Sequence, residues 1–357
     1  MTLLNRYLVK EFLTSTLLIM AALLAMFAFF DLIQELDSMG KGSYGIAKVL
    51  FFVALSAPGN IYDVAPVAVL VGSMIALGHL SRHSELTILR VSGVSLMGIA
   101  WTLLRVGIIF TILTFIIGEL ITPISEKSAQ RLKIKARDAV VAQDFQSGLW
   151  VKDGNSFVNV KEVSADVGLL NINIYEFDDA FNLKTISAAK SAIYDEKDSW
   201  RLSEVTQTFF SNESLKTQFS AAANWKSLIR PELLNILLVA PEKMSAWSLY
   251  AYINHLSINK QKTSRHEMAL WAKMIYPLAC LVMVILALPF GFLQQRSATA
   301  SSKILAGIMI GVTYQIMNRV FMHLGFLNDW PPFFSAITPT LIFLFIALML
   351  IYQVERR

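Results

Sequence analysis

A cluster of basic side chains is the part of this sequence best suited to bind a ligand. It lies in SEKSAQRLKIKARDAV, directly after a long apolar segment, and its members are Lys127, Arg131, Lys133, Lys135 and Arg137. Ammonium and guanidinium groups form charge-assisted hydrogen bonds with phosphate oxygens. In a helix, Lys127, Arg131 and Lys135 would lie on one face, because they are spaced four residues apart. Two interpretations stay open: a site for an anionic group such as a lipid phosphate, and a solvated face whose charge is balanced by Glu126 and Asp138.

A second candidate site is the hydrophilic stretch SRHSELTILRVSGVS, residues 81–95, which connects two apolar segments. A serine before Glu85 can cap a short helix, and Gly93 can end it. Leu86 and Leu89 would share an apolar face, which a turn surrounded by water does not need. The stretch is therefore either a plain reversing loop or a short helix that docks on a partner.

Motifs for catalysis and metal binding are absent from the sequence. MGKGSYG lacks the spacing of the phosphate-binding loop G-x-x-x-x-G-K-[ST]. The histidines show no H-E-x-x-H or comparable metal-ligand spacing, and no G-x-S-x-G segment could carry a nucleophilic serine. We therefore expect that the chain is not an enzyme, that it binds no metal or cofactor of its own, and that nucleic acid is not among its partners.

Apolar segments long enough to cross a membrane must position these residues. The chain has 357 residues, of which 55% are hydrophobic and 16% are charged. A helix needs about 20 apolar residues to span a bilayer, and five segments clearly reach this length: 13–30, 101–121, 270–293, 304–324 and 333–352. A sixth segment, 61–80, contains small residues of the kind that let membrane helices approach closely. We predict six transmembrane helices, of which the first is retained in the mature protein.

Four ionisable residues lie near the ends of these spans: Arg105, Glu119, Lys273 and Arg319. A charge at the centre of a bilayer would mark an ion or proton path. Because all four lie close to an edge, we interpret them as side chains that extend to water.

Basic residues in the short connections indicate the orientation of the chain, because they gather on the cytoplasmic side of a membrane. They precede the first span, separate the second from the third and the fourth from the fifth, and close the chain: Arg6, Lys10, Arg82, Arg90, Arg296, Lys303, Arg356 and Arg357. We therefore expect both termini and residues 81–95 in the cytoplasm, and the long segment 123–267 outside.

The external segment differs in composition from the spans. Runs such as SFVNV, LNINIYEF and WRLSEVTQTFF alternate with the turn signals KDGN and DDAFN. Short strands at this spacing predict a small antiparallel sandwich or an open jelly roll, and SAWSLYAYINHLSINKQ predicts an amphipathic helix at its end. The predicted fold is membrane α-helical with an inserted all-β, jelly-roll-like domain. Its parts are residues 1–122 with three spans, 123–267 with the β domain and flanking helices, and 268–357 with three spans.

Four stretches of the sequence resemble one family of membrane proteins. SELTILRVSGVS, GLWVKDGNSFVNV, WAKMIYPLA and ALPFGF, within six spans interrupted by a β domain, are similar to the lipopolysaccharide export permeases of Gram-negative bacteria. The resemblance covers essentially the whole chain. GSYG and GLWVKDGN resemble the G type of these permeases more than the F type.

This resemblance implies a transport function and a set of partners. Such permeases belong to an ABC transporter that extracts lipopolysaccharide from the inner membrane and passes it to a periplasmic bridge toward the outer membrane. The implied complex contains a paralogous F-type permease and two copies of a cytoplasmic ATPase, which binds ATP and Mg. A periplasmic bridge protein and its membrane-anchored component complete it. Two alternatives that move no lipid stay open: a mechanotransmitting permease of the ABC type, and a membrane-anchored periplasmic scaffold.

The resemblance also implies roles for residues on the cytoplasmic face. Glu85 matches the acidic position of the coupling helix, which rests in a groove of the ATPase. Its neighbours in this implied contact are Arg82, Leu86, Leu89 and Arg90.

On the outer face, Lys133 matches a basic position beside the phosphates of the lipid. Further phosphate contacts are implied for Arg131, Lys135 and Lys41. The sequence departs from the family pattern at the outer end of the first span, which carries acidic residues at Asp31, Glu35 and Asp37. We therefore do not expect that end to bind phosphate, unless a divalent cation bridges the acids to it.

Overall fold

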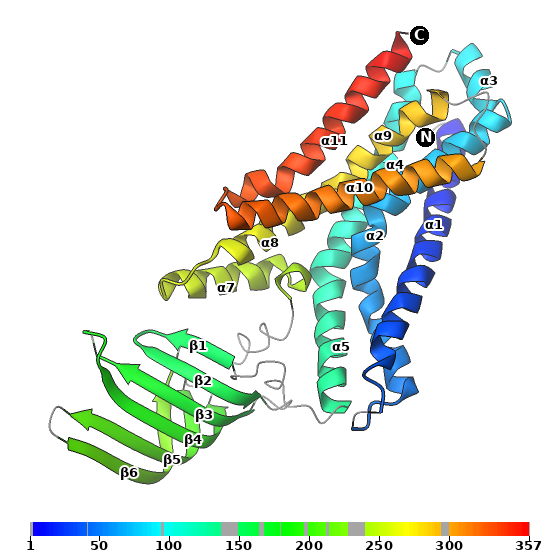
Figure 1. Cartoon of the computed structure of the whole chain (residues 1–357). Coiled ribbons are helices and arrows are strands. Elements are labelled where there is room, and N and C mark those ends of the chain that lie inside the picture. Colours follow the sequence, from blue (N-terminus) through cyan, green and yellow to red (C-terminus); the bar gives the residue numbers. More distant parts are fainter. Residues whose placement is uncertain are drawn as a thin grey trace.

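The computed structural model, drawn as a ribbon in Figure 1, places a bundle of long helices at one end and a β-sheet at the other. The structure describes residues 3–40, 42–93, 96–136, 149–163, 168–178, 180–195, 199–211, 214–227, 240–293 and 300–356. Both chain ends lie at the tip of the helical part, far from the sheet (Figure 1).

The helical part contains six helical routes that are each long enough to span a membrane. Helices α1 (Leu3–Leu36) and α2 (Ile46–Arg82) are followed by the short helix α3 (Glu85–Val91). The third route consists of α4 (Leu96–Ile116), the π-helix η1 (Ile117–Ile121) and α5 (Thr122–Ala136). The fourth consists of α8 (Ser264–Ile275), η4 (Tyr276–Leu278) and α9 (Ala279–Leu293), and the last two are α10 (Ala300–Leu327) and α11 (Pro332–Glu355). Within the described residues, six helical stretches are long and apolar enough to span a membrane, which confirms the six predicted spans.

The third span continues as a helix beyond residue 121, where the apolar segment ends. In the π-helix, the amide of Thr122 bonds to the carbonyl of Ile117, five residues earlier. The wider turn accommodates Pro123, which has no amide hydrogen and would clash with the carbonyl of an ordinary α-turn. The basic residues of α5 are therefore carried on a continuation of the membrane helix, and the expected division between residues 122 and 123 lies inside it.

Helix α2 forms the centre of the membrane part, and small residues bring two other helices against it. A Cβ atom at Gly72 would lie 2.5 Å from the Cα atom of Thr16 in α1, and one at Gly311 of α10 would lie 2.7 Å from Cγ1 of Val67. Side chains at these glycines would push the helices apart. Helices α1 and α10, which correspond to the first and fifth spans, thus both pack closely on α2.

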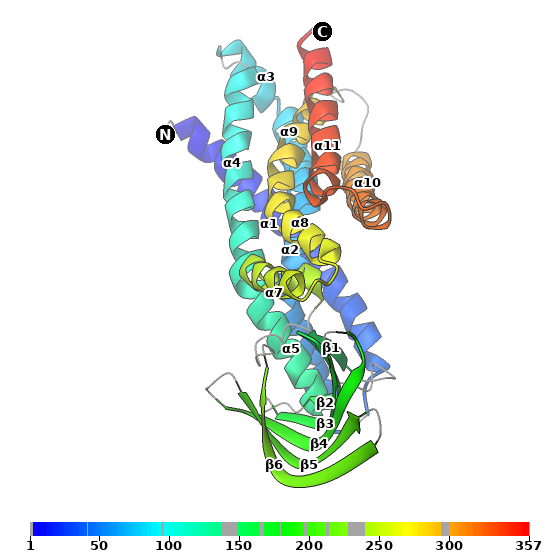
Figure 2. The same ribbon diagram turned by 90° about the vertical axis from the view of Figure 1, so that its left-hand side faces the viewer.

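The β domain is a single antiparallel sheet in the part of it that is described. Its strands are β1 (Leu149–Asp153), β2 (Ser156–Val163), β3 (Gly168–Phe177), β4 (Leu183–Asp195), β5 (Ser199–Ser211) and β6 (Ser214–Lys226), paired in sequence order. Successive side chains of a strand point to opposite faces, and one face buries Val158, Ile172 and Leu202 around the fully buried Trp200. Figure 2 shows that the sheet is strongly curved. The prediction of an inserted all-β domain is confirmed.

Helix α7 (Ala246–Ile258), preceded by the 3-10 turn η3 (Pro241–Lys243), joins the sheet to the membrane helices. The carboxylate of Glu119 accepts hydrogen bonds from the amide of Ala246 at 2.8 and 2.9 Å. At the other end of α7, the side-chain oxygen of Asn259 accepts a bond from the amide of Gly154, in the β1–β2 turn, at 3.0 Å. Burial lowers the pKa of the neighbouring His255 below its usual 6.5, against a smaller opposite effect of Asp153.

Candidate functional site

An ion pair holds together the ends of α1 and α5 that lie toward the sheet, the side that we call outer (Figure 1). Nζ of Lys133 lies 2.7 Å from Oε1 of Glu35, and the hydroxyl of Tyr44 donates to Oε2 of the same carboxylate at 3.0 Å. Glu35 is 7% exposed and Tyr44 is 1% exposed. The Lys133 ammonium also lies 5.1 Å from the centre of the Phe52 ring in α2, within the range of a cation–π interaction. Lys133 therefore connects α5 to both α1 and α2.

The connection between α1 and α2 is hydrogen-bonded to the end of α5. The amide and the hydroxyl of Ser43 donate to the carbonyl of Ala136 at 2.7 and 3.0 Å, and the ammonium of Lys48 donates to Oγ of Ser43 at 2.8 Å. The last carbonyls of a helix have no partner within it, so these bonds fix the end of α5. We name this region the outer corner, and it consists of Glu35, Ser43, Tyr44, Lys48 and Lys133.

Three of the four residues implied to bind phosphate lie on α5. Arg131 and Lys133 are half-buried and Lys135 is exposed, and Arg131 and Lys135 both interact with other residues of the chain. Lys41 lies outside the described residues, as does Asp138. We also considered Glu126 as a counter-charge for this helix, but its carboxylate pairs with Lys243, which precedes α7, at 3.1 Å.

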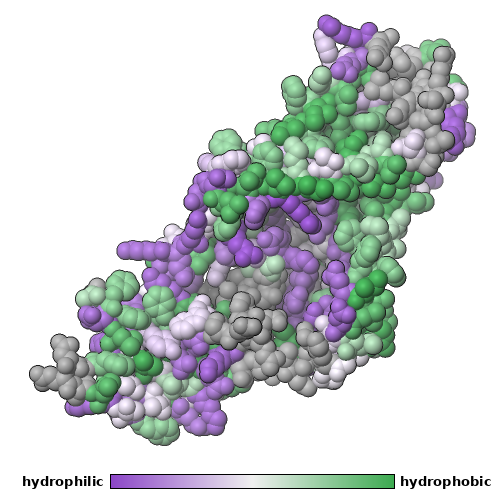
Figure 3. Space-filling model, viewed as in Figure 1, coloured by the Kyte–Doolittle hydropathy of each residue, from purple (hydrophilic) through white to green (hydrophobic). Residues whose placement is uncertain are grey.

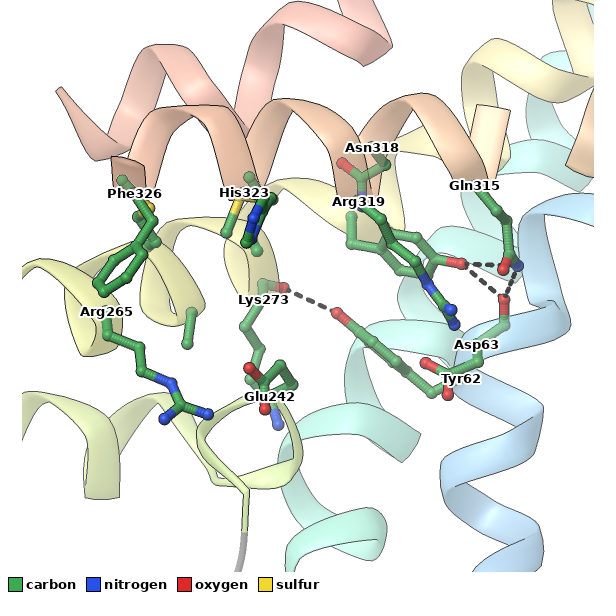
Figure 4. Close-up of a pocket in the computed structure, with 15 residues that line it drawn as sticks. Tyr62, Asp63, Glu242, Arg265, Lys273, Gln315, Asn318, Arg319, His323 and Phe326 are labelled. Carbon is green, nitrogen blue, oxygen red and sulfur yellow. Dashed lines mark hydrogen bonds between the residues drawn. The ribbon is translucent and has the colours of Figure 1, made fainter. Parts of the chain in front are cut away.

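A polar pocket lies beneath the outer half of α10. Its volume is about 660 Å³, and its ionisable lining residues are Tyr62, Asp63, Glu242, Arg265, Lys273, Tyr276, Arg319 and His323. Figure 3 shows hydrophilic residues gathered in a hollow below the apolar surface of α10. In Figure 4, the Arg319 side chain extends from α10 toward Asp63 of α2. The pocket therefore brings charged groups of both signs to a site between α2, α8 and α10.

Hydrogen bonds fix the wall of this pocket. The backbone carbonyl of Asp63 accepts bonds from the hydroxyl of Tyr276 at 2.6 Å and from Nε2 of Gln315 at 2.7 Å. These bonds (Figure 4) connect α2 to η4 and α10 at one level of the membrane part. The position of α10 relative to α2 is thus set by polar contacts on its outer half and by the close approach at Gly311 on its inner half.

The interpretation that the charges near the span ends extend to water is wrong for Lys273. Lys273 is only 5% exposed, and its ammonium donates a hydrogen bond to the backbone carbonyl of Met244. Glu119 also has a partner inside the protein, since it binds the first amides of α7. Arg319, by contrast, is exposed and lines the pocket. Two of these charges therefore connect the fourth and third spans to the segment that leads to the β domain.

On the opposite face, the stretch 81–95 contains a real helix, α3, which packs on the membrane core. Leu86 is 1% exposed within the main hydrophobic core, and Leu89 packs against that core. The carboxylate of Glu85 lies close to the side chain of Tyr7 in α1. Gly93 ends the segment with a left-handed φ of +88°, a conformation that glycine adopts readily. Helix α3 thus packs on the core through one of its faces.

The other face of α3 is apolar and exposed. Ile88 is 61% exposed and Val91 is 85% exposed, and Arg82, just before the helix, is also exposed. The side chain of Arg90 lies outside the described part of the structure. Because Leu86 and Leu89 face the chain itself, Ile88 and Val91 are the apolar side chains available to a partner. The sequence contained this signal, since these two residues have the same spacing of three as the leucine pair.

Comparison with known proteins connects these features to a family. The family described as lipopolysaccharide export system permease LptF/LptG matches residues 6–353 of the chain. The chain is 32% identical over 342 residues to the lipopolysaccharide export system permease protein LptG of Haemophilus influenzae, and the match covers 96% of each chain. It is 29% identical over 352 residues to the protein of the same name from Escherichia coli strain K12, over 98% of each chain. The similarity therefore includes both the spans and the β domain.

Proposed function

This chain belongs to the lipopolysaccharide export system permease LptF/LptG family, and we propose that it is a permease subunit of an ABC transporter for lipopolysaccharide. In this proposal it extracts lipopolysaccharide from the inner membrane and passes it, along its periplasmic β domain, to a bridge that leads to the outer membrane. The observation that carries the proposal is the extent of the similarity, which runs through all six spans and the sheet.

The proposed complex pairs this chain with a paralogous F-type permease on two copies of a cytoplasmic ABC ATPase. The ATPase binds ATP and Mg and hydrolyses ATP, and this chain has no catalytic role. On the periplasmic side, the complex contacts a bridge protein and its membrane-anchored component. The exposed apolar residues Ile88 and Val91 support the ATPase contact, because a protein surface that covers them removes apolar area from water.

The proposed orientation has both termini and α3 in the cytoplasm and the β domain in the periplasm. Figure 1 supports it, because the two chain ends and α3 gather at the end of the molecule opposite the sheet. Among the described residues, Arg6, Lys10, Arg82 and Arg356 belong to the same end as α3 (Figure 1), in agreement with the usual excess of basic residues on the cytoplasmic side.

The outer corner and the basic residues next to it are the proposed contact for the phosphate groups of lipopolysaccharide. Lys133, Arg131 and Lys135 present cationic groups on α5 where this helix leaves the apolar part of the third span, and Lys41 is the fourth proposed contact. Phosphate oxygens accept strong hydrogen bonds from such groups. The pocket beside Arg319 offers a second polar surface at the outer half of α10.

Movement of the ATPase reaches the lipid, in this proposal, through α3 and α1. The Leu86 side chain fixes α3 in the membrane core, and Glu85 lies close to Tyr7 near the start of α1. Helix α1 runs unbroken from Leu3 to Leu36, so its outer end carries Glu35 at the outer corner. Closure of the ATPase dimer therefore shifts α1 and narrows the cavity between the two permeases, which drives the lipid outward.

The experiment that tests this function measures ATP-dependent release of lipopolysaccharide from proteoliposomes containing the full complex, with bridge protein as the acceptor. Changing Arg131, Lys133 and Lys135 together to glutamine is expected to lower lipid crosslinking to this chain by about tenfold, while basal ATP hydrolysis continues. Lys190→Gln is the control, because it removes an exposed lysine of β4 that pairs with Glu204. Unchanged crosslinking in the triple variant would contradict the phosphate assignment.

The two rival functions predict other results. A mechanotransmitting permease that moves no lipid would purify without lipopolysaccharide and would release none. A periplasmic scaffold would keep its function when residues 81–95 are replaced by an inert linker. Lipid bound to the purified complex, together with loss of release on linker replacement, supports export over both rivals.

A further inference from the structure

We propose that Glu35 competes with a lipid phosphate for Lys133 and thereby keeps phosphate binding at the outer corner weak enough for the lipid to be released. The inference rests on the proposed transport function and assigns a role to an acidic residue at the outer end of α1. Glu35 is then a specificity-determining residue, although it does not itself bind the anion.

Both oxygens of Glu35 are engaged within the protein. Oε1 lies 2.7 Å from the Lys133 ammonium, and Oε2 accepts the hydroxyl of Tyr44 at 3.0 Å. Because the Tyr44 residue is almost fully buried, it holds the carboxylate at the end of α1. The carboxylate is therefore fixed beside Lys133, and its position does not depend on a flexible side chain in solvent.

The ammonium is the more accessible partner of this pair. The Lys133 side chain is 23% exposed, against 10% for Glu35. A lysine ammonium has three donors, so an anion that approaches from outside can bond to Lys133 while the carboxylate remains on its inner side. The approaching phosphate then meets a cation whose charge is already neutralised, and it is repelled by a carboxylate on the far side of that cation.

Replacing Glu35 with a phosphate as the partner of Lys133 has both a favourable and an unfavourable contribution to the binding free energy. A phosphate monoester carries a charge of about −1.5 to −2 near neutral pH and outcompetes a single carboxylate for a cation in charge alone. Full displacement would leave Glu35 as a buried, unpaired charge, which is strongly unfavourable. The charge of Glu35 therefore weakens phosphate binding at Lys133, and the affinity of this site for phosphate is moderate.

Moderate affinity suits a transporter. A conducting site must bind its cargo well enough to capture it and weakly enough to release it, as ion channels illustrate. Four interactions hold Lys133 and the end of α5 without Glu35: the two bonds from Ser43, the bond from Lys48 to Ser43, and the contact of Lys133 with Phe52. The position of the corner thus does not depend on the acid alone, which leaves its charge free to tune lipid binding.

The test compares lipid binding and lipid release in the full complex reconstituted in nanodiscs or proteoliposomes. The probes are bisphosphorylated lipid A and the same lipid after removal of its phosphates, and binding is read from a photoreactive residue placed at Ile134. Glu35→Gln is expected to bind bisphosphorylated lipid A about tenfold more tightly, to leave the dephosphorylated lipid unchanged, and to slow ATP-dependent release. A residue with a merely structural role would instead lower both binding and release.

Three further variants make the result specific. Asp37→Asn removes an equal charge from the same end of α1 at an exposed position, and it is expected to change binding less than twofold, because its charge is screened by water. Tyr44→Phe removes the second contact of Glu35 and is expected to change phosphate selectivity less than Glu35→Gln does. In a Lys133→Gln background, Glu35→Gln should no longer tighten binding, because the cation for which the two anions compete is gone.

The outcomes separate the inference from the function on which it rests. Equal or weaker binding of bisphosphorylated lipid A to the Glu35→Gln complex, with the wild-type complex binding normally, overturns the role of Glu35 alone. Tighter binding that persists in the Lys133→Gln background also overturns it. Failure of the wild-type complex to bind either lipid overturns the transport function and the inference together.

Discussion

The outer corner and helix α3 lie on opposite faces of the membrane part and are held by different forces. At the outer corner, Glu35 and Lys133 form an ion pair at 2.7 Å that is largely buried. Helix α3 is anchored by the buried Leu86, and it presents Ile88 and Val91 with 61% and 85% of their surfaces exposed. At the outer corner, charged groups are paired within the protein. On α3, apolar side chains are exposed.

This difference indicates what each face can bind. Covering exposed aliphatic side chains with another protein lowers the free energy of the system. This stabilisation requires no rearrangement of α3. Paired charges must share or exchange a partner before they bind an anion, so binding there is coupled to the positions of α1 and α5. The inner face therefore suits a permanent protein contact, and the outer face suits a ligand that arrives and leaves.

Charges placed on the exposed face of α3 should prevent assembly with the ATPase. Changing Ile88 and Val91 together to aspartate should abolish co-purification of the ATPase, with a loss of affinity of at least about tenfold, because two charges would be buried without partners. Ser92→Asp places the same charge at an exposed position next to this face and is the control. Normal assembly of the double variant would show that the ATPase binds elsewhere.

A smaller effect is expected from a second ion pair on the outer side. Glu126 and Lys243 pair at 3.1 Å, and their side chains are 6% and 36% exposed. Glu126→Ala should lower the free energy of unfolding by about 2–3 kcal/mol, below the values for fully buried pairs, because Lys243 can reach water. Thermal unfolding followed by tryptophan fluorescence measures this loss. Lys190→Ala, which breaks an exposed pair, should lower it by about 0–1 kcal/mol; equal losses in the two variants would contradict the distinction.

The smallest effect concerns the joint between α7 and the sheet. Because burial lowers the pKa of His255 from 6.5, the folded joint binds protons less readily than the unfolded chain does. Its stability is therefore complete above pH 6.5 and falls as the pH drops through 6.5 toward the folded pKa. Hydrogen exchange at the Gly154 amide, corrected for the intrinsic pH dependence, should become about two- to fivefold faster at pH 5.5 than at pH 7.5. In His255→Gln, this acceleration should disappear; its persistence would assign the effect to another group.

Much of the fold could be predicted from the sequence because it follows from local patterns. Apolar length predicted six spans, and alternation with turn signals predicted the inserted β domain. Short stretches such as SELTILRVSGVS carried the family resemblance, which the match over residues 6–353 confirms. These features need no knowledge of contacts between distant parts of the chain.

The contacts within the candidate site depend on how distant segments meet, and the sequence did not predict them. Glu35 and Lys133 are 98 residues apart, and their pairing is decided by the packing of α1 and α5 on α2. The pairing of Glu126 with Lys243 joins residues that are 117 positions apart. Spacing also could not show which apolar face of α3 is buried, because Leu86 and Ile88 lie in the same short helix and only packing on the core separates them.

We propose that ATP-driven movement enters through α3 and expels a lipid held at the outer corner. The most direct test is crosslinking of lipopolysaccharide to a photoreactive residue at Ile134 in the full complex, before and after addition of ATP. We predict strong crosslinking without ATP and a loss of most of it during ATP hydrolysis, and this loss should be absent when residues 81–95 are replaced by an inert linker. Crosslinking that is unaffected by ATP in the wild-type complex would contradict the account.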